Sequence, residues 1–316
     1  MLSLHTNNAA LSAQNSISKT QSNLSTSMTR LSTGYRINSA MDDAAGLQIA
    51  SRLKAQTSGM TVAMRNTQNS TSMLQTAEGA LDEVSNMLIR MKDLATQAAD
   101  ASSTADDKTA MQSEFDALGK ELANVMKNTT FGGKNLLAGS EAIGEGDDAI
   151  AAKPGTLSSK MTFQIGASAS ETMEIDLSTD LKGLTDALAL ATGKYDEAAP
   201  AEGDAPVAGT ELVGTTDGDG VNTPTANATI TLLATALDKV GTVRSGLGAA
   251  ANRLEHVYNN LANISSNTKA ATGQIMDVDF ASESANMTSN QMLLQASTAM
   301  LKQSNSQSSL VMSLLQ

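Results

Sequence analysis

The feature that most constrains the fold is a long run of apolar residues spaced alternately three and four positions apart. The run comprises Leu233, Ala236, Val240, Val243, Leu247, Ala250, Leu254, Val257, Leu261 and Ile264. This spacing places the side chains on one stripe of an α-helix, the stripe through which helices pack in bundles and coiled coils. A stripe that continues over so many turns needs a partner of similar length. The sequence therefore predicts long helices packed side by side.

Other stretches of the chain carry the same spacing and supply the partners. Residues 60–100 contain two interleaved seven-residue series, which are Leu74, Leu81, Leu88 and Ala95, and Ala77, Val84, Met91 and Ala98. A shorter return helix is predicted from Met111 to Val125, with Ser103 or Thr104 as its N-cap. Terminal helices are predicted from two further series, which are Ile17, Leu24, Met28 and Leu31, and Met287, Leu294, Leu301 and Leu315.

These patterns predict a mainly α fold of long antiparallel helical rods, a coiled-coil-like bundle in which N- and C-terminal segments pair. Gly34 and Gly273 are expected to separate the outermost helices from the inner rods, because glycine commonly ends a helix.

The two ends of the chain carry almost no charge. Lys19 is the only charged side chain in residues 1–29, and Lys302 is the only one in residues 284–316. A helix face that stays in water normally carries charges and pairs of opposite charge. We therefore expect the terminal helices to become ordered by packing against copies of the chain in an assembly. Disordered tails are the alternative, which the apolar residues in register disfavour.

The middle of the chain has the opposite character. Residues 141–225 hold 16 acidic and 4 basic side chains, which accounts for the whole net charge of −12, and all four prolines. Within this region, Met161, Phe163 and Ile165 alternate with polar residues, and Met173, Ile175 and Leu177 do the same. This alternation predicts a β-hairpin at about 161–178. Residues 181–225 are predicted to form a short, acidic, surface-exposed loop.

The composition argues against an enzyme and against several kinds of ligand. The chain has no cysteine and only two histidines, and it lacks metal-binding and phosphate-binding motifs, so no cofactor or metal is expected. An isoelectric point near 4.6 disfavours nucleic acid, whose binding relies on basic side chains. No apolar stretch is long enough to span a membrane. The first residues lack the basic and apolar regions of a cleaved signal peptide.

Several motifs resemble segments of bacterial flagellins. They are LSTGYRINSAMDDAAGL at residues 31–47, NNAALSAQ at 7–14, FGGKNLL at 131–137, and the closing residues 310–316. The resemblance covers about residues 1–180 and 226–316. It implies a secreted, extracellular subunit that self-assembles into the flagellar filament for motility. It also implies export through the flagellar type III system, with an export chaperone, the filament cap and hook-junction proteins as partners.

The resemblance also implies a division into domains. Residues 1–44 with 275–316 would form the inner tube of the filament, residues 45–180 with 226–274 the outer tube, and residues 181–225 a short surface loop. So short a central insert is similar to lateral-type or minimal flagellins. The polymerisation interface is expected to comprise Leu4, Leu11, Leu24, Leu31, Arg36, Asp42, Asp43, Leu294, Leu301 and Leu315.

The Asp42–Asp43 pair has two interpretations. By resemblance, Arg36 and the two aspartates contact neighbouring subunits in the filament. Alternatively, Asn38 or Ser39 caps a helix, and the aspartates complement the helix dipole in its first turn.

A second surface resembles the patch that an innate immune Toll-like receptor recognises on flagellins. Arg90, Leu94 and Glu114 match the residues of that patch, whereas Ile89 stands where a polar residue is common. A purely structural interpretation places Leu88 and Met91 in the core and Arg90 on a solvated flank.

Two other protein classes remain open as alternatives. A hook–filament junction protein shares the terminal architecture of flagellins. A secreted adhesin would use residues 181–225 as its binding lobe.

Overall fold

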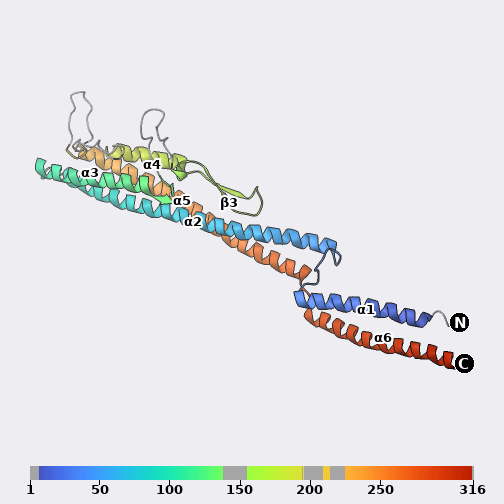
Figure 1. The fold of residues 1–316 in the computed structure, drawn as a ribbon. Coiled ribbons are helices and arrows are strands. Elements are labelled where there is room, and N and C mark those ends of the chain that lie inside the picture. The colour runs from blue at the N-terminus through green and yellow to red at the C-terminus, as the bar shows by residue number, and fades with distance from the viewer. Residues whose placement is uncertain (1–6, 138–154, 194, 196–208, 214–224, 315–316) are drawn as a thin grey trace, which may run out of the picture. The chain divides into compact units, whose positions relative to one another are not determined.

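The computed structural model describes residues 7–137, 155–193, 195, 209–213 and 225–314. The helices in this part of the chain are α1 (Asn8–Thr33), α2 (Ala44–Ala98), α3 (Ala105–Asn128), α4 (Ser178–Ala191), α5 (Ala226–Met276) and α6 (Phe280–Leu314) (Figure 1). The strands are β1 (Thr130–Phe131), β2 (Lys134–Asn135), β3 (Met161–Gln164) and β4 (Thr172–Ile175), and a 3-10 turn covers Thr156–Ser158. The prediction of a mainly α fold with a small hairpin region is confirmed.

The chain divides into two compact units. The terminal unit comprises residues 1–58 and 263–316, and the central unit comprises residues 59–262. Both units therefore combine segments from the two halves of the chain, as the matching heptad patterns predicted. The divisions fall within α2 and within α5.

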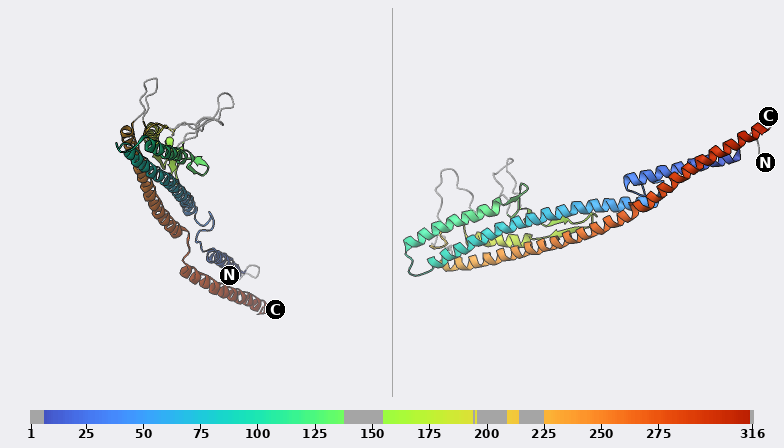
Figure 2. Two further views of the ribbon diagram at one scale, coloured as in Figure 1. Left: turned by 90° about the vertical axis from the view of Figure 1, so that its left-hand side faces the viewer. Right: turned by 90° about the horizontal axis from the view of Figure 1, so that it is seen from below.

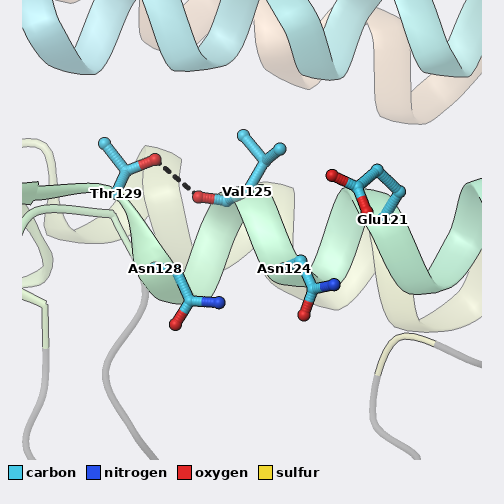
Figure 3. A pocket seen from close by; sticks show the side chains of 5 residues that line it. All are labelled: Glu121, Asn124, Val125, Asn128 and Thr129. Carbon is cyan, nitrogen blue, oxygen red and sulfur yellow. Dashed lines mark hydrogen bonds between the residues drawn. The ribbon is translucent and has the colours of Figure 1, made fainter.

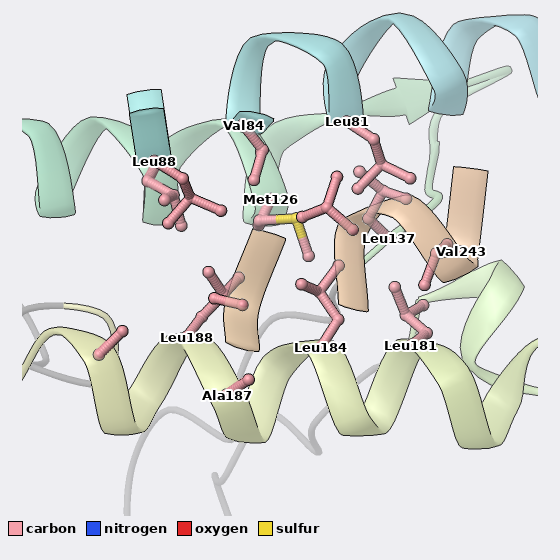
Figure 4. Packing of buried hydrophobic residues seen from close by; sticks show 14 of the residues in the cluster. Leu81, Val84, Leu88, Met126, Leu137, Leu181, Leu184, Ala187, Leu188 and Val243 are labelled. Atoms are coloured by element: carbon pink, nitrogen blue, oxygen red, sulfur yellow. The ribbon is translucent and has the colours of Figure 1, made fainter. Parts of the chain in front are cut away.

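The central unit contains a continuous hydrophobic core. Leu81, Val84 and Leu88 of α2 point toward Leu181, Leu184 and Leu188 of α4, with Met126 of α3 and Val243 of α5 beside them (Figure 4). All eight residues of the two series predicted in α2 are buried, and so are the residues of the α5 series from Leu233 to Leu254. Burying one such leucine stabilises the fold by about 1.5–3 kcal/mol. Ile264, the last member of the α5 series, is wrongly predicted as a packed residue, because 38% of it is exposed.

The return helix α3 begins as predicted. Thr104 is its N-cap: the Thr104 hydroxyl accepts the N–H of Asp107, and the carboxylate of Asp107 accepts the N–H of Thr104. This reciprocal arrangement satisfies two backbone donors that the first turn of a helix leaves unpaired. The hydrogen bonds from the Thr104 hydroxyl and backbone also hold the pKa of Asp107 below its usual value.

The predicted hairpin is confirmed. Strand β3 pairs antiparallel with β4, and Met161 lies opposite Ile175 while Phe163 lies opposite Met173. Met173 and Ile175 are buried, and Met161 and Phe163 pack against the same core. The period of two therefore puts one apolar face of the hairpin onto the helices.

The prediction of a loop over residues 181–225 is wrong at its start. Helix α4 covers Ser178–Ala191 and buries Leu181, Leu184 and Leu188. These leucines have helical spacing. The run is short, however, and the neighbouring residues are acidic and rich in glycine, a composition that favours a loop. Residues 209–213 also pack inward, with Leu212 buried. Residues 194, 196–208 and 214–224 of the predicted loop lie outside the described residues.

In the terminal unit, α1 and α6 run side by side and antiparallel (Figures 1 and 2). At one end, Nδ2 of Asn7 donates to the carbonyl of Ser304 over 3.3 Å. At the other end, Arg30 lies 3.7 Å from the carboxylate of Glu283. The pairing of N- and C-terminal segments is thus confirmed.

The two glycines predicted as helix breaks behave differently. Gly34 adopts φ 75° and its N–H donates to the carbonyl of Arg30, which ends α1 in a left-handed cap. Gly273 does not end a helix, because α5 continues to Met276. The break comes at Asp277, which pairs with Tyr35 in an isolated antiparallel bridge.

Candidate assembly surface

The contact between α1 and α6 alternates apolar positions with small or polar ones. On α1, the apolar residues Ala10, Ile17, Leu24 and Leu31 alternate along the shielded side with Ala13, Thr20, Ser27 and Gly34. On α6, Met287, Leu294 and Leu301 alternate with Glu283, Asn290, Ser297 and Ser304. Coiled coils that are stable alone carry apolar residues at both of these positions. This seam between α1 and α6 is therefore a weak contact compared with the core of the central unit.

Very little apolar surface is buried inside the terminal unit. Among its described residues, Ile37 and Ala50 are the only buried hydrophobic side chains. Leu24, Leu31, Leu294 and Leu301 of the predicted interface are half-buried in the seam. The terminal unit therefore leaves much of its apolar surface in water.

Part of that surface lies on the sides of α1 and α6 that turn away from the seam. Leu11 and Met28 are exposed on α1, and Met292, Leu293 and Met300 are exposed on α6. Leu293 and Met300 lie about 20° apart around the helix, and Met292 lies within about 100° of both, so the three α6 residues form one flank. We call these three residues the α6 flank. Exposed apolar patches bordered by polar residues mark sites of protein contact.

The predicted interface residues thus fall into separate groups. Leu11 lies outward, while Leu24, Leu31, Leu294 and Leu301 lie in the seam, and Leu4 and Leu315 lie outside the described residues. The prediction omitted Met28 and the α6 flank. The spacing of these residues is present in the sequence. The prediction instead followed the residues that now lie in the seam, because they form a longer series of seven-residue repeats.

Arg36 ties together the two chain segments that join the helices. Its backbone N–H donates to the carbonyl of Met276 over 2.6 Å, and its Nη2 donates to the carbonyl of Ile275 over 2.9 Å. The N–H of Val278 donates to the carbonyl of Gly34 over 3.0 Å. The end of α1 and the end of α5 are therefore fastened to each other within the terminal unit.

Asp42 and Asp43 organise the turn that precedes α2. The N–H groups of Ser39 and Asn38 donate to Oδ2 of Asp42 at 2.9 and 3.1 Å, and they hold the pKa of Asp42 below its usual value. The N–H of Gly46 donates to Oδ1 of Asp43 at 2.9 Å, which makes Asp43 the N-cap of α2.

The alternative in which Asn38 or Ser39 caps a helix containing both aspartates is wrong, because α2 begins only at Ala44. The turn explains part of the motif at residues 31–47. A Cβ at Gly46 would lie 2.5 Å from Oδ2 of Asp43 and 2.8 Å from Cδ1 of Ile37, so a larger residue does not fit without movement.

Arg36 and Asp42 remain exposed despite these internal contacts. Their surfaces are therefore open to a neighbouring molecule.

The second predicted surface lies in the central unit. Nε of Arg90 donates to Oε1 of Glu114 over 2.8 Å, and Nη2 of Arg90 lies 2.6 Å from the same oxygen. Both side chains are about half exposed, whereas Leu94 is buried in the core. The structure thus brings Arg90 and Glu114 together at the surface, whereas Leu94 is not exposed beside them.

A buried polar cluster was not predicted. Nε2 of Gln112 donates to Asp116 and to Glu211, each over 2.7 Å, and Oε1 of Gln112 accepts the N–H of Leu212 over 2.8 Å. Oε1 of Glu211 accepts the N–H of Gly193. These bonds fasten residues 209–213 onto α3. Glu211 is far from Gln112 in sequence, so no local spacing indicated the contact.

A hollow on α3 is lined by Glu121, Asn124, Val125, Asn128 and Thr129, and the Thr129 hydroxyl donates to the carbonyl of Val125 (Figure 3). Its side chains lie along one side of a helix and do not enclose a ligand. Within the described residues, no group of histidines and carboxylates could hold a metal ion. None of the helices described is long and apolar enough to cross a membrane.

Comparisons with known proteins agree with the terminal motifs. The family model of the bacterial flagellin N-terminal helical region matches residues 4–142, and that of the C-terminal helical region matches residues 230–315. Flagellin A of Vibrio anguillarum is 37% identical and flagellin A of Vibrio cholerae is 35% identical, each with both chains covered in full. A solved structure of a putative flagellar hook-associated protein from Vibrio parahaemolyticus has a TM-score of 0.50 at 16% identity, covering 75% of this chain and 100% of that one. At that identity the likeness concerns the fold alone.

Proposed function

The chain belongs to the bacterial flagellin family and is a structural subunit of the flagellar filament, and from this premise we propose that α1 and α6 make the contacts that join its subunits. The observation that carries the proposal is the imbalance within the terminal unit. Two helices of 26 and 35 residues accompany only two buried hydrophobic side chains in the described part of that unit. Isolated helices gain too little from intrinsic propensity to be stable in water.

Assembly supplies the burial that the terminal unit lacks. The α6 flank, together with Leu11 and Met28, would pack against the same helices of neighbouring subunits. Repetition of one heterologous contact between identical chains produces an open helical polymer. In this arrangement the terminal helices would form an inner tube and the long helices of the central unit an outer one.

The remaining predicted interface residues fit the same proposal. Arg36, Asp42 and Asp43 hold the turn that joins α1 to α2, and the exposed parts of Arg36 and Asp42 are available to a neighbouring subunit. Leu24, Leu31, Leu294 and Leu301 would contribute by keeping α1 and α6 paired, so that the outward residues are presented together.

We further propose that the subunit reaches the filament by export through the flagellar type III system. Weakly packed terminal helices support this route, because a chain that passes through a narrow secretion channel must unfold easily. An export chaperone would cover the apolar terminal segments before export, and the filament cap and hook-junction proteins would receive them afterwards. The mature location would then be extracellular.

Seeded polymerisation tests the central proposal. Purified protein is mixed with short filament seeds at neutral pH and examined by electron microscopy, and long tubes are expected. A Leu293→Ser substitution on the α6 flank should slow elongation about tenfold or more, because it removes most of the burial of one leucine. Leu190→Ser is the matched control, since Leu190 is 66% exposed and Leu293 is 52% exposed. Equal elongation by the two variants would contradict a role for the α6 flank.

Recognition by a Toll-like receptor is a separate proposal for the Arg90–Glu114 surface. A receptor reporter assay compares the parent chain with Arg90→Glu and with the double variant Arg90→Glu/Glu114→Arg. The double variant restores an ion pair between the two positions with reversed charges. If the receptor contacts Arg90 directly, both variants lose activity. Recovery of activity in the double variant would show that only the ion pair matters, and unchanged activity in both would reject the proposal.

Copy number separates the filament role from that of a hook–filament junction protein. Quantitative mass spectrometry of isolated flagella is expected to find many more copies of this chain than of the hook protein. A content close to that of one short ring would instead favour the junction protein. Attachment assays with residues 214–224 of the proposed 181–225 lobe deleted would detect an adhesin, since that role predicts a loss of attachment with filaments intact.

A further inference from the structure

Methionines are divided unevenly between the two units. In the central unit, nine methionines are buried or half-buried, and they are Met60, Met64, Met73, Met87, Met91, Met111, Met126, Met161 and Met173. Among the described residues, the exposed methionines all belong to the terminal unit: Met28 (54% exposed), Met41 (96%), Met292 (61%) and Met300 (67%). Three of these four lie on the outward sides of α1 and α6.

An exposed methionine is a site of oxidation by peroxides. The thioether sulfur attacks one peroxide oxygen, the O–O bond breaks, and the oxygen remains on sulfur as a sulfoxide while the other oxygen leaves as water or an alcohol. The sulfur loses two electrons and the peroxide gains them. Susceptibility follows access to solvent. The chain has no cysteine, so methionine provides its only sulfur.

We propose that Met28, Met292 and Met300 are oxidation sites at which peroxides block incorporation of the subunit into a filament. The inference rests on the proposed role of α1 and α6 in subunit contacts. A sulfoxide is polar, and burying it without a hydrogen-bond donor is unfavourable. On the α6 flank, Met292 and Met300 lie beside Leu293, which offers no side-chain donor. Oxidation therefore changes an apolar contact surface into a polar one.

The same chemistry spares the fold of the central unit. Met91 and Met126 are fully buried, so a peroxide reaches them only when the unit opens. Oxidised subunits are then folded in the centre but defective in assembly. Subunits already packed in a filament have these side chains covered and are protected. The block consequently acts on free subunits.

A partition experiment tests the inference. Full-length protein is treated with hydrogen peroxide until about half of the exposed methionines are oxidised, and is then offered untreated seeds. Filaments and unassembled protein are separated by sedimentation, and peptide mass spectrometry measures sulfoxide at each methionine in both fractions. We expect sulfoxide at Met28, Met292 and Met300 to be depleted about tenfold in the filaments, from the burial of one methionine side chain. Equal sulfoxide at these positions in both fractions would overturn the inference.

A variant provides the matched control. Met28→Leu/Met292→Leu/Met300→Leu preserves side-chain volume and apolar character and lacks the reactive sulfur. Its elongation rate is expected to survive peroxide, whereas that of a Met41→Leu variant should fall like that of the parent chain. An equal fall in the triple variant and the parent would also overturn the inference. Untreated parent protein that does not elongate would contradict the proposed function instead, and the two failures are thereby distinguished.

Discussion

The central and terminal units contain helices of similar length and similar heptad spacing, yet only one of them has a core. In the central unit, both packing positions of each heptad from Leu74 to Ala98 of α2 are apolar and buried, as with Leu81 and Val84. In the terminal unit, one of the two positions is small or polar, as with Leu24 and Ser27. A heptad pattern alone therefore does not distinguish a helix that is stable within its own chain from one that depends on other chains. The distinction lies in the second packing position of each heptad, which is apolar in the central unit and small or polar in the terminal unit.

The largest expected effect is a core truncation in the central unit. Phe115→Ala should lower the free energy of unfolding by about 3–5 kcal/mol, because a fully buried aromatic side chain is replaced by a cavity. Thermal unfolding followed by circular dichroism measures the change. A shift in the midpoint of only a degree or so would mean that the central unit does not unfold cooperatively around this core.

A truncation in the seam between α1 and α6 should have a smaller effect. Leu294→Ala removes a half-buried leucine, and we expect about 1–1.5 kcal/mol of local destabilisation. Hydrogen exchange should show faster opening of α1 and α6, while the unfolding midpoint of the central unit stays unchanged. A loss as large as that of Phe115→Ala would break the comparison between the units.

Removing the capping box of α3 should cost about 1 kcal/mol. Thr104→Ala eliminates the hydroxyl that accepts the N–H of Asp107. Because the hydroxyl of Thr104 also lowers the pKa of Asp107, the pKa of that carboxyl should rise in the variant, as measured by NMR titration. Thr109→Ala, within the same helix, is the control and should leave the pKa of Asp107 unchanged.

The smallest effect concerns acid. The N–H groups of Ser39 and Asn38 lower the folded-state pKa of Asp42 from its ordinary value of 3.8. Asp42 therefore contributes stability that is complete above that ordinary value and is lost as the pH falls through the lowered pKa. Acid below this range should loosen the turn at residues 38–42, detected as a lower protection factor of the Ser39 amide against hydrogen exchange. Asp42→Asn should exchange faster at neutral pH and lose this acid dependence.

The sequence predicted most accurately where one local pattern determines the structure. The series from Leu74 to Ala98 and the hairpin around Phe163 depend on a single period, and both are confirmed. The N-cap at Thr104 follows from residues three positions apart. Each of these features is decided within one element, so distant parts of the chain do not alter it.

The incorrect predictions arise where distant residues decide. Helix α4 is stabilised by burial of Leu184 against other helices, which its own composition did not indicate. Residues 209–213 are held by Gln112, almost 100 positions away. The predicted interface relied on the longest apolar heptad series of the terminal helices, and in the structure this series lies in the seam between α1 and α6. Which face of a helix is already covered depends on its partner, so the exposed α6 flank could be recognised only after α1 and α6 were paired.

The alternation along the seam between α1 and α6 has a mechanical consequence. Every seven residues, or about 10 Å of helix, the seam presents nearly the same sequence of apolar and polar positions. A slide of one helix along the other by that length restores similar contacts, whereas an intermediate slide does not. The Asn7–Ser304 and Arg30–Glu283 contacts at the two ends distinguish the native register from its neighbours. Under axial load, α6 is therefore expected to slide along α1 in steps of one heptad. The pair should resist displacements smaller than one step, and the two end contacts should oppose the first step.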